Sequence, residues 1–439
     1  MHNQLSTLYP QHLATVRKNA DHALALGGFE HLLIAAGMPG IKFLDDMHYP
    51  YAVSPHFKYW LPLLNAPGSW IVHTPGAKPK LIFLQPRDYW HVVPDAPCGY
   101  WVDAFEIVIV RSAEHAIAEL PSGKCAVIGE PTAAIGGIEI NNPKQVMDYL
   151  HYHRSYKTPY ELVLMREASR IGTRAHRAAE QAFRMGESEL GIHQAYLAAA
   201  GQTDAELPYS SIVALNEHGA VLHYMDFTRR PPKPARSLLI DAGASALGYA
   251  SDITRTYAGE DAGEFQALID AMDANQQSQV AMVRSGRSYA DLHLHAHHQL
   301  AGVLKQHDFI HMDAESAVES GVTRAFFPHG LGHSIGLQVH DVGGFQKNAQ
   351  GDTLARPDGH PFLRMTRTLE PNMVVTIEPG LYFIDMLLGE LRDGPVAKDI
   401  NWHKIEAFKP YGGIRIEDDV ICTDDAPENM TRDAFSQLG

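Results

Sequence analysis

The spacing of apolar residues predicts both helices and strands in the first third of the chain. Residues 11–26 carry apolar side chains three or four positions apart, as in an amphipathic helix. Short apolar runs that are typical of buried strands follow at residues 32–35, 69–73, 81–84 and 125–129. Strands with intervening helices indicate an α/β or α+β first domain.

A new pattern begins after the first third of the chain. Thr158 is a good N-cap, Pro159 suits the first helical position, and Glu161 completes a capping box. The segment that follows keeps apolar residues three or four positions apart, so it predicts a long helix. We therefore expect two domains, residues 1–156 and residues 157–439.

The second domain also mixes helix and strand patterns. Helices are predicted at residues 262–283 and 289–305, and Ser288 with Asp291 caps the second of these. Strands are predicted at residues 211–215, 237–242, 250–257, 374–377 and 413–417. Helices that flank a mostly antiparallel or mixed sheet define an α+β domain.

Composition and charge exclude several classes of protein. The chain has 439 residues, 45% of them hydrophobic and 20% charged, which is ordinary for a folded globular protein. Its formal net charge of −15 argues against a nucleic acid or an anionic membrane as the main partner. The N-terminus has no apolar signal region, and three scattered cysteines suit a reducing compartment. We expect a cytoplasmic protein.

Carboxylates stand in unusual places in the second domain. Four of them follow or interrupt apolar strand segments: Asp241, Asp252, Glu378 and Glu417. A carboxylate at the edge of an apolar core is costly unless a positive group meets it. Any one of them could cap a helix or pair with a base, but only Arg255 and Arg415 lie close to them in sequence. Metal ions account for all four together.

Three histidines support a metal site. His329, His333 and His340 fall within one glycine-rich segment, where a helix is disfavoured and the glutamate of an HExxH zinc helix is missing. We expect a loop or strand that presents imidazoles. Oxygen ligands with one imidazole suit Mn²⁺, Co²⁺ or Zn²⁺. Two such ions neutralise four carboxylates, and a hydroxide that bridges them is a natural nucleophile.

A second group of histidines has a different expectation. His293, His295, His297 and His298 fall in a predicted helix, where positions two apart lie about 200° around the axis. We expect them to form a solvated or mixed face and to bind no ion.

The ordered series of acids and one histidine resembles the ligand set of the pita-bread metallopeptidases. The segments that carry it are similar to those of bacterial Xaa-Pro dipeptidases (prolidases), close to the organophosphorus acid anhydrolase type: LLIDAG, SDITRTY, FFPHGLGHSIGLQVHDVGG, TIEPGLYF and GGIRIEDD. The resemblance implies a creatinase-like N-terminal domain that dimerises and contributes to the partner's active site. It also implies a C-terminal pita-bread domain, a homodimer and two metal ions, usually Mn²⁺.

The resemblance also implies roles for particular residues. Its five metal ligands would be Asp241, Asp252, His333, Glu378 and Glu417, with Asp252 and Glu417 bridging the ions and Glu378 as general base. His223 and His340 would stabilise the tetrahedral intermediate. The substrate-binding residues would be His329, Arg364, Arg415, Tyr209 and, from the partner, Asp46. Arg364 would hold the substrate carboxylate, and Asp46 would meet the free α-amino group.

The expected reaction is hydrolysis of Xaa-Pro dipeptides, with release of free proline. Aminopeptidase P, which accepts longer Xaa-Pro peptides, is the alternative within the same fold, but a carboxylate anchor at Arg364 opposes it. A metal-free binding or chaperone module and a creatinase-type amidinohydrolase are less consistent with a complete ligand set. Hydrolysis of organophosphorus triesters is a side activity that the sequence leaves open.

Overall fold

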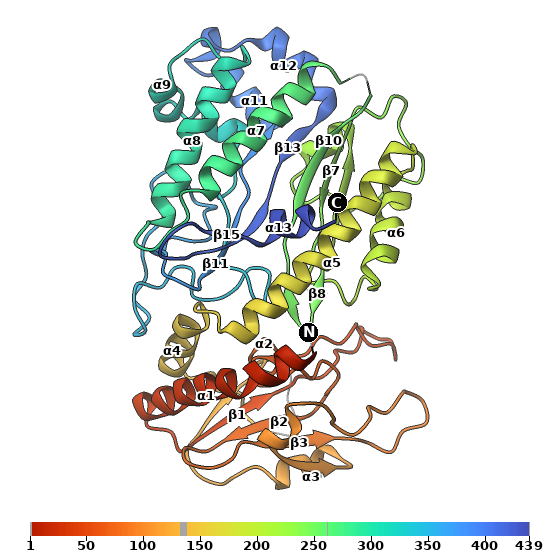
Figure 1. Ribbon diagram of the computed structural model, residues 1–439, viewed down its shortest axis with the longest axis vertical. Coiled ribbons are helices and arrows are strands. Elements are labelled where there is room, and N and C mark those ends of the chain that lie inside the picture. The colour runs from red at the N-terminus through yellow and green to blue at the C-terminus, as the bar shows by residue number, and fades with distance from the viewer. Residues whose placement is uncertain (1, 132–137, 261, 439) are drawn as a thin grey trace. The chain divides into compact units, whose positions relative to one another are not determined.

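The computed structural model describes residues 2–131, 138–260 and 262–438 (Figure 1). The chain divides into two compact units. The first unit comprises Met1–Leu164, Leu247–Tyr249 and Asn348–Asp352, and the second comprises Met165–Ala246, Ala250–Lys347 and Thr353–Gly439.

The first unit is built on one mixed sheet. Its elements are α1 (His2–Gly27), β1 (His31–Ala35), α2 (Pro55–Lys58), β2 (Trp70–His73), β3 (Lys80–Leu84), the 3-10 helix η1 (Val102–Ala104), β4 (Glu106–Val110), α3 (Ala113–Ala118), β5 (Cys125–Ile128) and α4 (Lys144–Arg154). The strand order is β4-β3-β2-β1-β5. The pairs β1–β5 and β3–β4 are parallel, whereas β1–β2 and β2–β3 are antiparallel.

The predicted elements of this unit are present, although the helices α2, α3 and α4 had no individual prediction. The helix predicted from residue 11 begins at His2, so Pro10 lies inside it instead of before it. The strand β4 was not predicted. It is an edge strand with a mostly half-exposed side-chain pattern, so its alternation is weak. The core between the sheet and its helices includes Leu33, Trp70 and Ile82.

The second unit combines several small sheets with long helices. Its elements are α5 (Pro159–Arg184, which starts in the first unit), α6 (Glu189–Ala200), β6 (Ile212–Leu215), η2 (Asn216–Ala220), β7 (Ser237–Asp241), β8 (Ser245–Ala246), β9 (Tyr249–Ala250), β10 (Thr254–Ala258), α7 (Glu264–Val280), α8 (Tyr289–Gln306), α9 (Ala314–Glu319), α10 (Val322–Phe326), β11 (Val374–Ile377), β12 (Gly380–Tyr382), α11 (Asp385–Arg392), η3 (Ala397–Asp399), α12 (Trp402–Phe408), η4 (Lys409–Tyr411), β13 (Gly413–Arg415), β14 (Asp418–Ile421), β15 (Glu428–Asn429) and α13 (Met430–Ser436). The sheets have the orders β10-β7-β6, β11-β14-β15, β12-β13 and β8-β9, and the pairings in the first three are antiparallel.

Helices cover these sheets. A core cluster joins α5 and α6 to β6 and β7, and in Figure 1 the pair α7 and α8 lies on the other side of β7 and β10. The predicted capping box of α5 is confirmed, because Thr158 N–H donates to Glu161 Oε2 at 2.8 Å and Glu161 N–H donates to Thr158 Oγ1 at 3.4 Å. Ser288 caps α8 as predicted, accepting the N–H of Asp291 at 3.2 Å.

Two predicted strands are interrupted at their acids. The segment 250–257 splits into β9 and β10, and Asp252 lies in the gap because its N–H donates to Asp419 Oδ2 instead of a neighbouring strand. The segment 413–417 ends as β13 at Arg415, and Glu417 makes only an isolated bridge to Thr254. Both carboxylates therefore lie where the regular ladder breaks.

The expectation for the histidines of α8 was wrong for two of them. His293 and His297 are buried on the inner face of α8, whereas His298 is exposed. Positions four apart share one face of a helix, and the prediction had weighed only positions two apart. Within the described ranges, no helix combines the length and the apolarity needed to span a membrane.

Candidate active site

One cavity of the second unit, about 880 Å³ in volume, collects most of the residues expected to be functional. Those that line it are Tyr209, His223, Asp241, Asp252, His329, His333, His340, Arg364, Glu378, Arg415 and Glu417. They come from segments as far apart as residues 209 and 417, which the fold brings together. Asp46 belongs to the first unit, where it lies exposed in a bend.

The four carboxylates lie at the ends of strands. Asp241 ends β7, Asp252 precedes β10, Glu378 follows β11, and Glu417 lies between β13 and β14. A side chain at a strand end can point away from the sheet, while the strand holds the backbone of that residue in place. The acids can therefore converge on one point although their strands belong to different sheets.

His333 is the imidazole held among these acids. Asp252, His333 and Glu417 each offer a ligand atom, and these atoms lie within 4.8 Å of one another. His333 Nε2 is 3.4 Å from Asp252 Oδ2 and 3.7 Å from Glu378 Oε1. His333 Nδ1 donates to the Ser334 carbonyl at 3.0 Å, so Nε2 is the nitrogen that faces the carboxylates.

The electrostatics of this group favour a bound cation. Burial raises the pKa of Glu378 to about 7, and burial together with the neighbouring carboxylates raises the pKa values of Asp241 and Glu417. Burial alone would lower the pKa of His333, but Asp252 and Glu378 raise it to about 9. Carboxylate oxygens with one imidazole fit a hard or borderline divalent ion.

Two neutral or positive groups already meet these carboxylates. Arg415 Nη2 lies 2.6 Å from Asp241 Oδ2. The Tyr209 hydroxyl lies 2.8 Å from Asp241 Oδ1 and 2.5 Å from Asp252 Oδ1. Tyr209, expected in the substrate pocket, therefore contacts two of the expected metal ligands.

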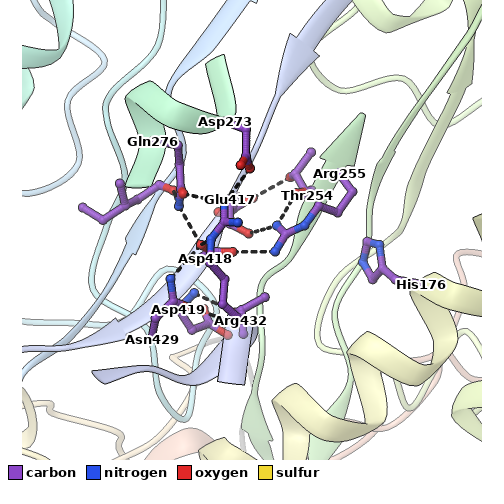
Figure 2. Close-up of polar contacts among 12 residues, drawn as sticks. His176, Thr254, Arg255, Asp273, Gln276, Glu417, Asp418, Asp419, Asn429 and Arg432 are labelled. Carbon is purple, nitrogen blue, oxygen red and sulfur yellow. Dashed lines mark hydrogen bonds and ion pairs between the residues drawn. The ribbon is translucent and has the colours of Figure 1, made fainter. Parts of the chain in front are cut away.

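A buried acid that sequence reasoning missed supports the strand of Glu417. Asp418 is surrounded in Figure 2 by four donors at 2.7 to 2.8 Å: Arg255 Nη2, Gln276 Nε2, Asn429 Nδ2 and Arg432 Nε. Burial alone would raise the pKa of Asp418, but the two arginines hold it below its usual value. Arg255 also donates to the Glu417 carbonyl at 2.7 Å, so it fixes the backbone of an expected ligand and pairs with none of the four acids. The only sequence signal was the acidic run after GGIRI.

Asp419 supports a second ligand in the same way. Its Oδ2 accepts the N–H of Asp252 at 3.1 Å, and Figure 2 places it beside Asp418. Burial and the nearby Asp252 raise the pKa of Asp419. Consecutive acids thus have three surroundings: Glu417 faces the cavity, Asp418 forms ion pairs, and Asp419 positions backbone.

A tyrosine joins the expected substrate residues. Tyr382 Oη lies 2.8 Å from Arg415 Nη1 and 2.8 Å from His329 Nε2. Because His329 Nδ1 donates to the Gly330 carbonyl at 2.8 Å, Nε2 accepts the tyrosine proton. Sequence reasoning quoted the TIEPGLYF segment but assigned Tyr382 no role.

The remaining expected residues surround the opening of the cavity. His223, His340 and Arg364 are exposed at its lining. Although the His340 side chain reaches the surface, partial burial of its ring lowers its pKa to about 4, and the positive charges of His333 and Arg364 add to this effect. His340 is therefore neutral near neutral pH and can accept or donate a hydrogen bond at either nitrogen.

Comparison with known proteins gives the family. Residues 7–152 match the Xaa-Pro dipeptidase N-terminal domain, and residues 163–424 match metallopeptidase family M24. The chain is 57% identical over 434 residues to the Xaa-Pro dipeptidase of Xanthomonas euvesicatoria, covering 98% of each chain. It is 57% identical over 431 residues to that of Stenotrophomonas maltophilia, covering 98% of this chain and 97% of that one.

Solved structures show the same fold. Aminopeptidase P from E. coli with the inhibitor Pro-Leu matches with a TM-score of 0.73 at 22% identity, covering 96% of this chain and 95% of that chain. Proline aminopeptidase P II from Yersinia pestis matches with a TM-score of 0.72, also at 22% identity, covering 97% and 100%. The expected α+β fold, a creatinase-like domain followed by a pita-bread domain, is confirmed. The chain belongs to metallopeptidase family M24, with an N-terminal domain of the Xaa-Pro dipeptidase type.

Proposed function

We propose that this chain is a metal-dependent exopeptidase that hydrolyses Xaa-Pro dipeptides and releases free proline. The observation that carries the proposal is the convergence of Asp252, His333 and Glu417, with Asp241 and Glu378 in the same cavity. Relatives that are 57% identical over nearly the whole chain are named Xaa-Pro dipeptidases, which supports the same substrate class.

The cofactor proposed is a pair of divalent ions, most simply Mn²⁺, with Co²⁺ or Zn²⁺ as alternatives. Arg415 offsets one of the four carboxylate charges. The negative charge that remains is larger than the positive charge of a single divalent ion, so a second ion is needed to neutralise it. Asp241, Asp252, His333, Glu378 and Glu417 would hold the ions. Bound ions would supply a water of lowered pKa and polarise the scissile carbonyl.

The residues around this centre have proposed roles in proton transfer. Glu378, whose pKa burial raises to about 7, is suited to take a proton from the attacking water and deliver it to the proline nitrogen. That nitrogen is a tertiary amide without N–H, so it needs a proton to leave. His223 and His340 would donate hydrogen bonds to the oxygen on which negative charge develops.

Substrate selection is proposed to depend on the arginine at the opening. Arg364 would hold the proline carboxylate, while His329, Arg415 and Tyr209 complete the pocket. A carboxylate anchor would exclude longer peptides, which distinguishes this proposal from an aminopeptidase P, the name of the similar solved structures. Hydrolysis of organophosphorus triesters stays a prediction that an assay with a nitrophenyl triester tests directly.

We also propose a homodimer in which the first domain, residues 1–156, contributes Asp46 to the partner's pocket. Its support is an apolar surface next to Asp46. The segments 41–49 and 89–92 lie side by side, since the His48 and His91 ring centroids are 5.9 Å apart. Leu44, Trp90 and Val92 are 91%, 78% and 93% exposed. Such a patch indicates a protein interface, and a second copy would cover it. The cytoplasmic location remains a prediction of the sequence.

One assay separates the candidate functions. Protein loaded with Mn²⁺ is incubated with Leu-Pro, Leu-Pro-Gly and Leu-Ala, and free amino acids are measured. Cleavage of Leu-Pro alone supports the dipeptidase. Cleavage of Leu-Pro-Gly at a similar rate would assign an aminopeptidase P instead, and inactivity on all three would remove the exopeptidase proposal.

A further inference from the structure

Three histidines form a buried cluster next to the cavity without lining it. His293 and His297 come from α8, and His360 comes from the segment that leads to Arg364. Their ring nitrogens lie within 4.8 Å of one another, and His293 Nε2 is 2.8 Å from His360 Nδ1. All three are buried. Three converging imidazoles could bind a zinc ion, so the hydrogen bonds of the rings are needed to distinguish a metal site from a hydrogen-bonded cluster.

The hydrogen bonds identify the cluster as an imidazole chain and not as a metal site. The backbone N–H of Leu331 donates to His293 Nδ1 at 3.2 Å. Burial lowers the pKa of His293 to about 3, so its ring is neutral and its single proton must be on Nε2. That proton points to His360 Nδ1. A metal would need the lone pair that Nε2 does not have in this tautomer.

This chain connects two segments that form walls of the cavity. Residues 328–333 carry His329 and His333, and Leu331 of this segment donates to His293. Residues 357–364 carry Arg364, and His360 of this segment accepts from His293. One imidazole of α8 therefore bonds both walls at once.

The backbones of the two walls are also in direct contact at one point. A Cβ placed on Gly330 would lie 2.9 Å from Leu363 Cα and 3.2 Å from the Phe362 carbonyl, so only glycine fits there. Because the backbones touch, the position of the second wall depends on that of the first, and the His293–His360 bond is a second link between them. Leu363 N–H donates to the His360 carbonyl at 3.3 Å. This bond links the backbone of His360 to the residue that precedes Arg364.

We propose that His293 and His360 are positioning residues that set the distance between the wall carrying His329 and the wall carrying Arg364. Their effect is on the fit of the dipeptide's carboxylate, so the inference rests on the proposed function. His297 supports them from the side: its ring stacks on Phe327 with centroids 4.9 Å apart and its Nδ1 contacts Thr323 Oγ1 at 3.0 Å.

Substitutions at His360 test the hydrogen bond separately from side-chain volume. His360→Asn keeps an acceptor oxygen near the place of Nδ1, whereas His360→Phe fills the space and leaves the His293 proton unpaired. The metal-loaded variants are assayed on Leu-Pro and Leu-Pro-amide. His193→Phe is the matched control, because His193 is also buried, contacts Asp204 at 2.8 Å and does not line the cavity.

We expect His360→Phe to raise KM for Leu-Pro roughly 5- to 100-fold, the range for one unsatisfied buried polar group, with kcat changed about twofold or less. KM for Leu-Pro-amide should rise less, and His360→Asn should restore KM for Leu-Pro to near the wild-type value. The control should leave KM unchanged. Unchanged KM in His360→Phe, or equal losses in both His360 variants, would overturn the inference.

Two further measurements distinguish failure of the positioning role from failure of the proposed function and from metal binding. Inactivity of the wild-type enzyme on Leu-Pro would contradict the proposed function, whereas active wild type with an unaltered His360→Phe variant contradicts only the positioning role. Zinc titration of wild type and His360→Phe tests the metal alternative. Loss of one bound zinc equivalent in His360→Phe would overturn the hydrogen-bond assignment, and equal zinc content supports it.

Discussion

Arg415 Nη2 lies 2.6 Å from Asp241 Oδ2, so this guanidinium is already paired with an expected metal ligand. Its other nitrogens are also engaged, with Nη1 at 2.8 Å from Tyr382 Oη and Nε at 3.2 Å from Thr254 Oγ1. A guanidinium binds a carboxylate best through two parallel N–H groups. Arg415 has no such free pair, whereas Arg364 stands exposed at the cavity. This difference supports the proposal that Arg364, and not Arg415, is the carboxylate anchor.

The first prediction concerns this anchor. Arg364→Ala should lower kcat/KM on Leu-Pro roughly 10- to 100-fold, which corresponds to one charge-assisted hydrogen bond at an exposed position. Arg392→Ala is the control, because Arg392 is an exposed arginine that pairs with Glu406 outside the cavity. The loss on Leu-Pro-amide should be much smaller, since that substrate has no carboxylate. Equal losses on both substrates would contradict the anchor.

The second prediction concerns the metal centre. Asp252→Asn removes the negative charge of a proposed metal ligand that contacts His333, so bound Mn²⁺ per chain should fall and activity should drop by more than about 100-fold. Circular dichroism should show an unchanged fold. Asp270→Asn, at an exposed acid of α7, should change neither value. Metal analysis that finds one ion or none in fully active wild-type protein would exclude the two-metal proposal.

The third prediction concerns the first unit. Asp46→Ala should raise KM for Leu-Pro with little change in kcat, because the proposed contact to the α-amino group would be made equally in the ground and transition states. Asp103→Ala, at another exposed acid of this unit, is the control. Sedimentation should give a dimer for both variants. A wild-type monomer with normal activity would contradict the contribution of Asp46 to a partner's pocket.

The fourth prediction concerns acid stability. Burial lowers the pKa of His297 from 6.5 to about 2. Below pH 6.5 the His297 ring is therefore protonated in the unfolded chain but stays neutral in the native protein. This ring's contribution to stability is therefore fully present above pH 6.5 and is lost as the pH falls toward 2. The slope is about 1.4 kcal/mol per pH unit.

His297→Phe removes this titration and keeps an aromatic ring against Phe327. The free energy of unfolding of the metal-free protein is measured in urea at about pH 7, 6 and 5. It should fall less steeply with decreasing pH for the variant than for wild type, and the difference in slope should correspond to about one bound proton. Parallel pH dependence for variant and wild type would show that His297 is not held neutral in the native state.

The sequence by itself determined the features that depend on neighbouring residues. The capping box of Thr158 and Glu161 formed as predicted, because both of its hydrogen bonds close within one helical turn. The strand-end acids were also recognisable, since a carboxylate after an apolar run is unusual whatever the rest of the chain does.

Only the tertiary structure decided which partner each of these groups received. Arg255 and Arg415 are both next to acids in sequence, yet one pairs with Asp418 and the other with Asp241, 174 residues away. His293 and His360 lie 67 residues apart, and their bond depends on how a helix packs against a loop. Packing between distant segments leaves no local pattern in the sequence, because it is selected by burial and shape when the whole chain folds.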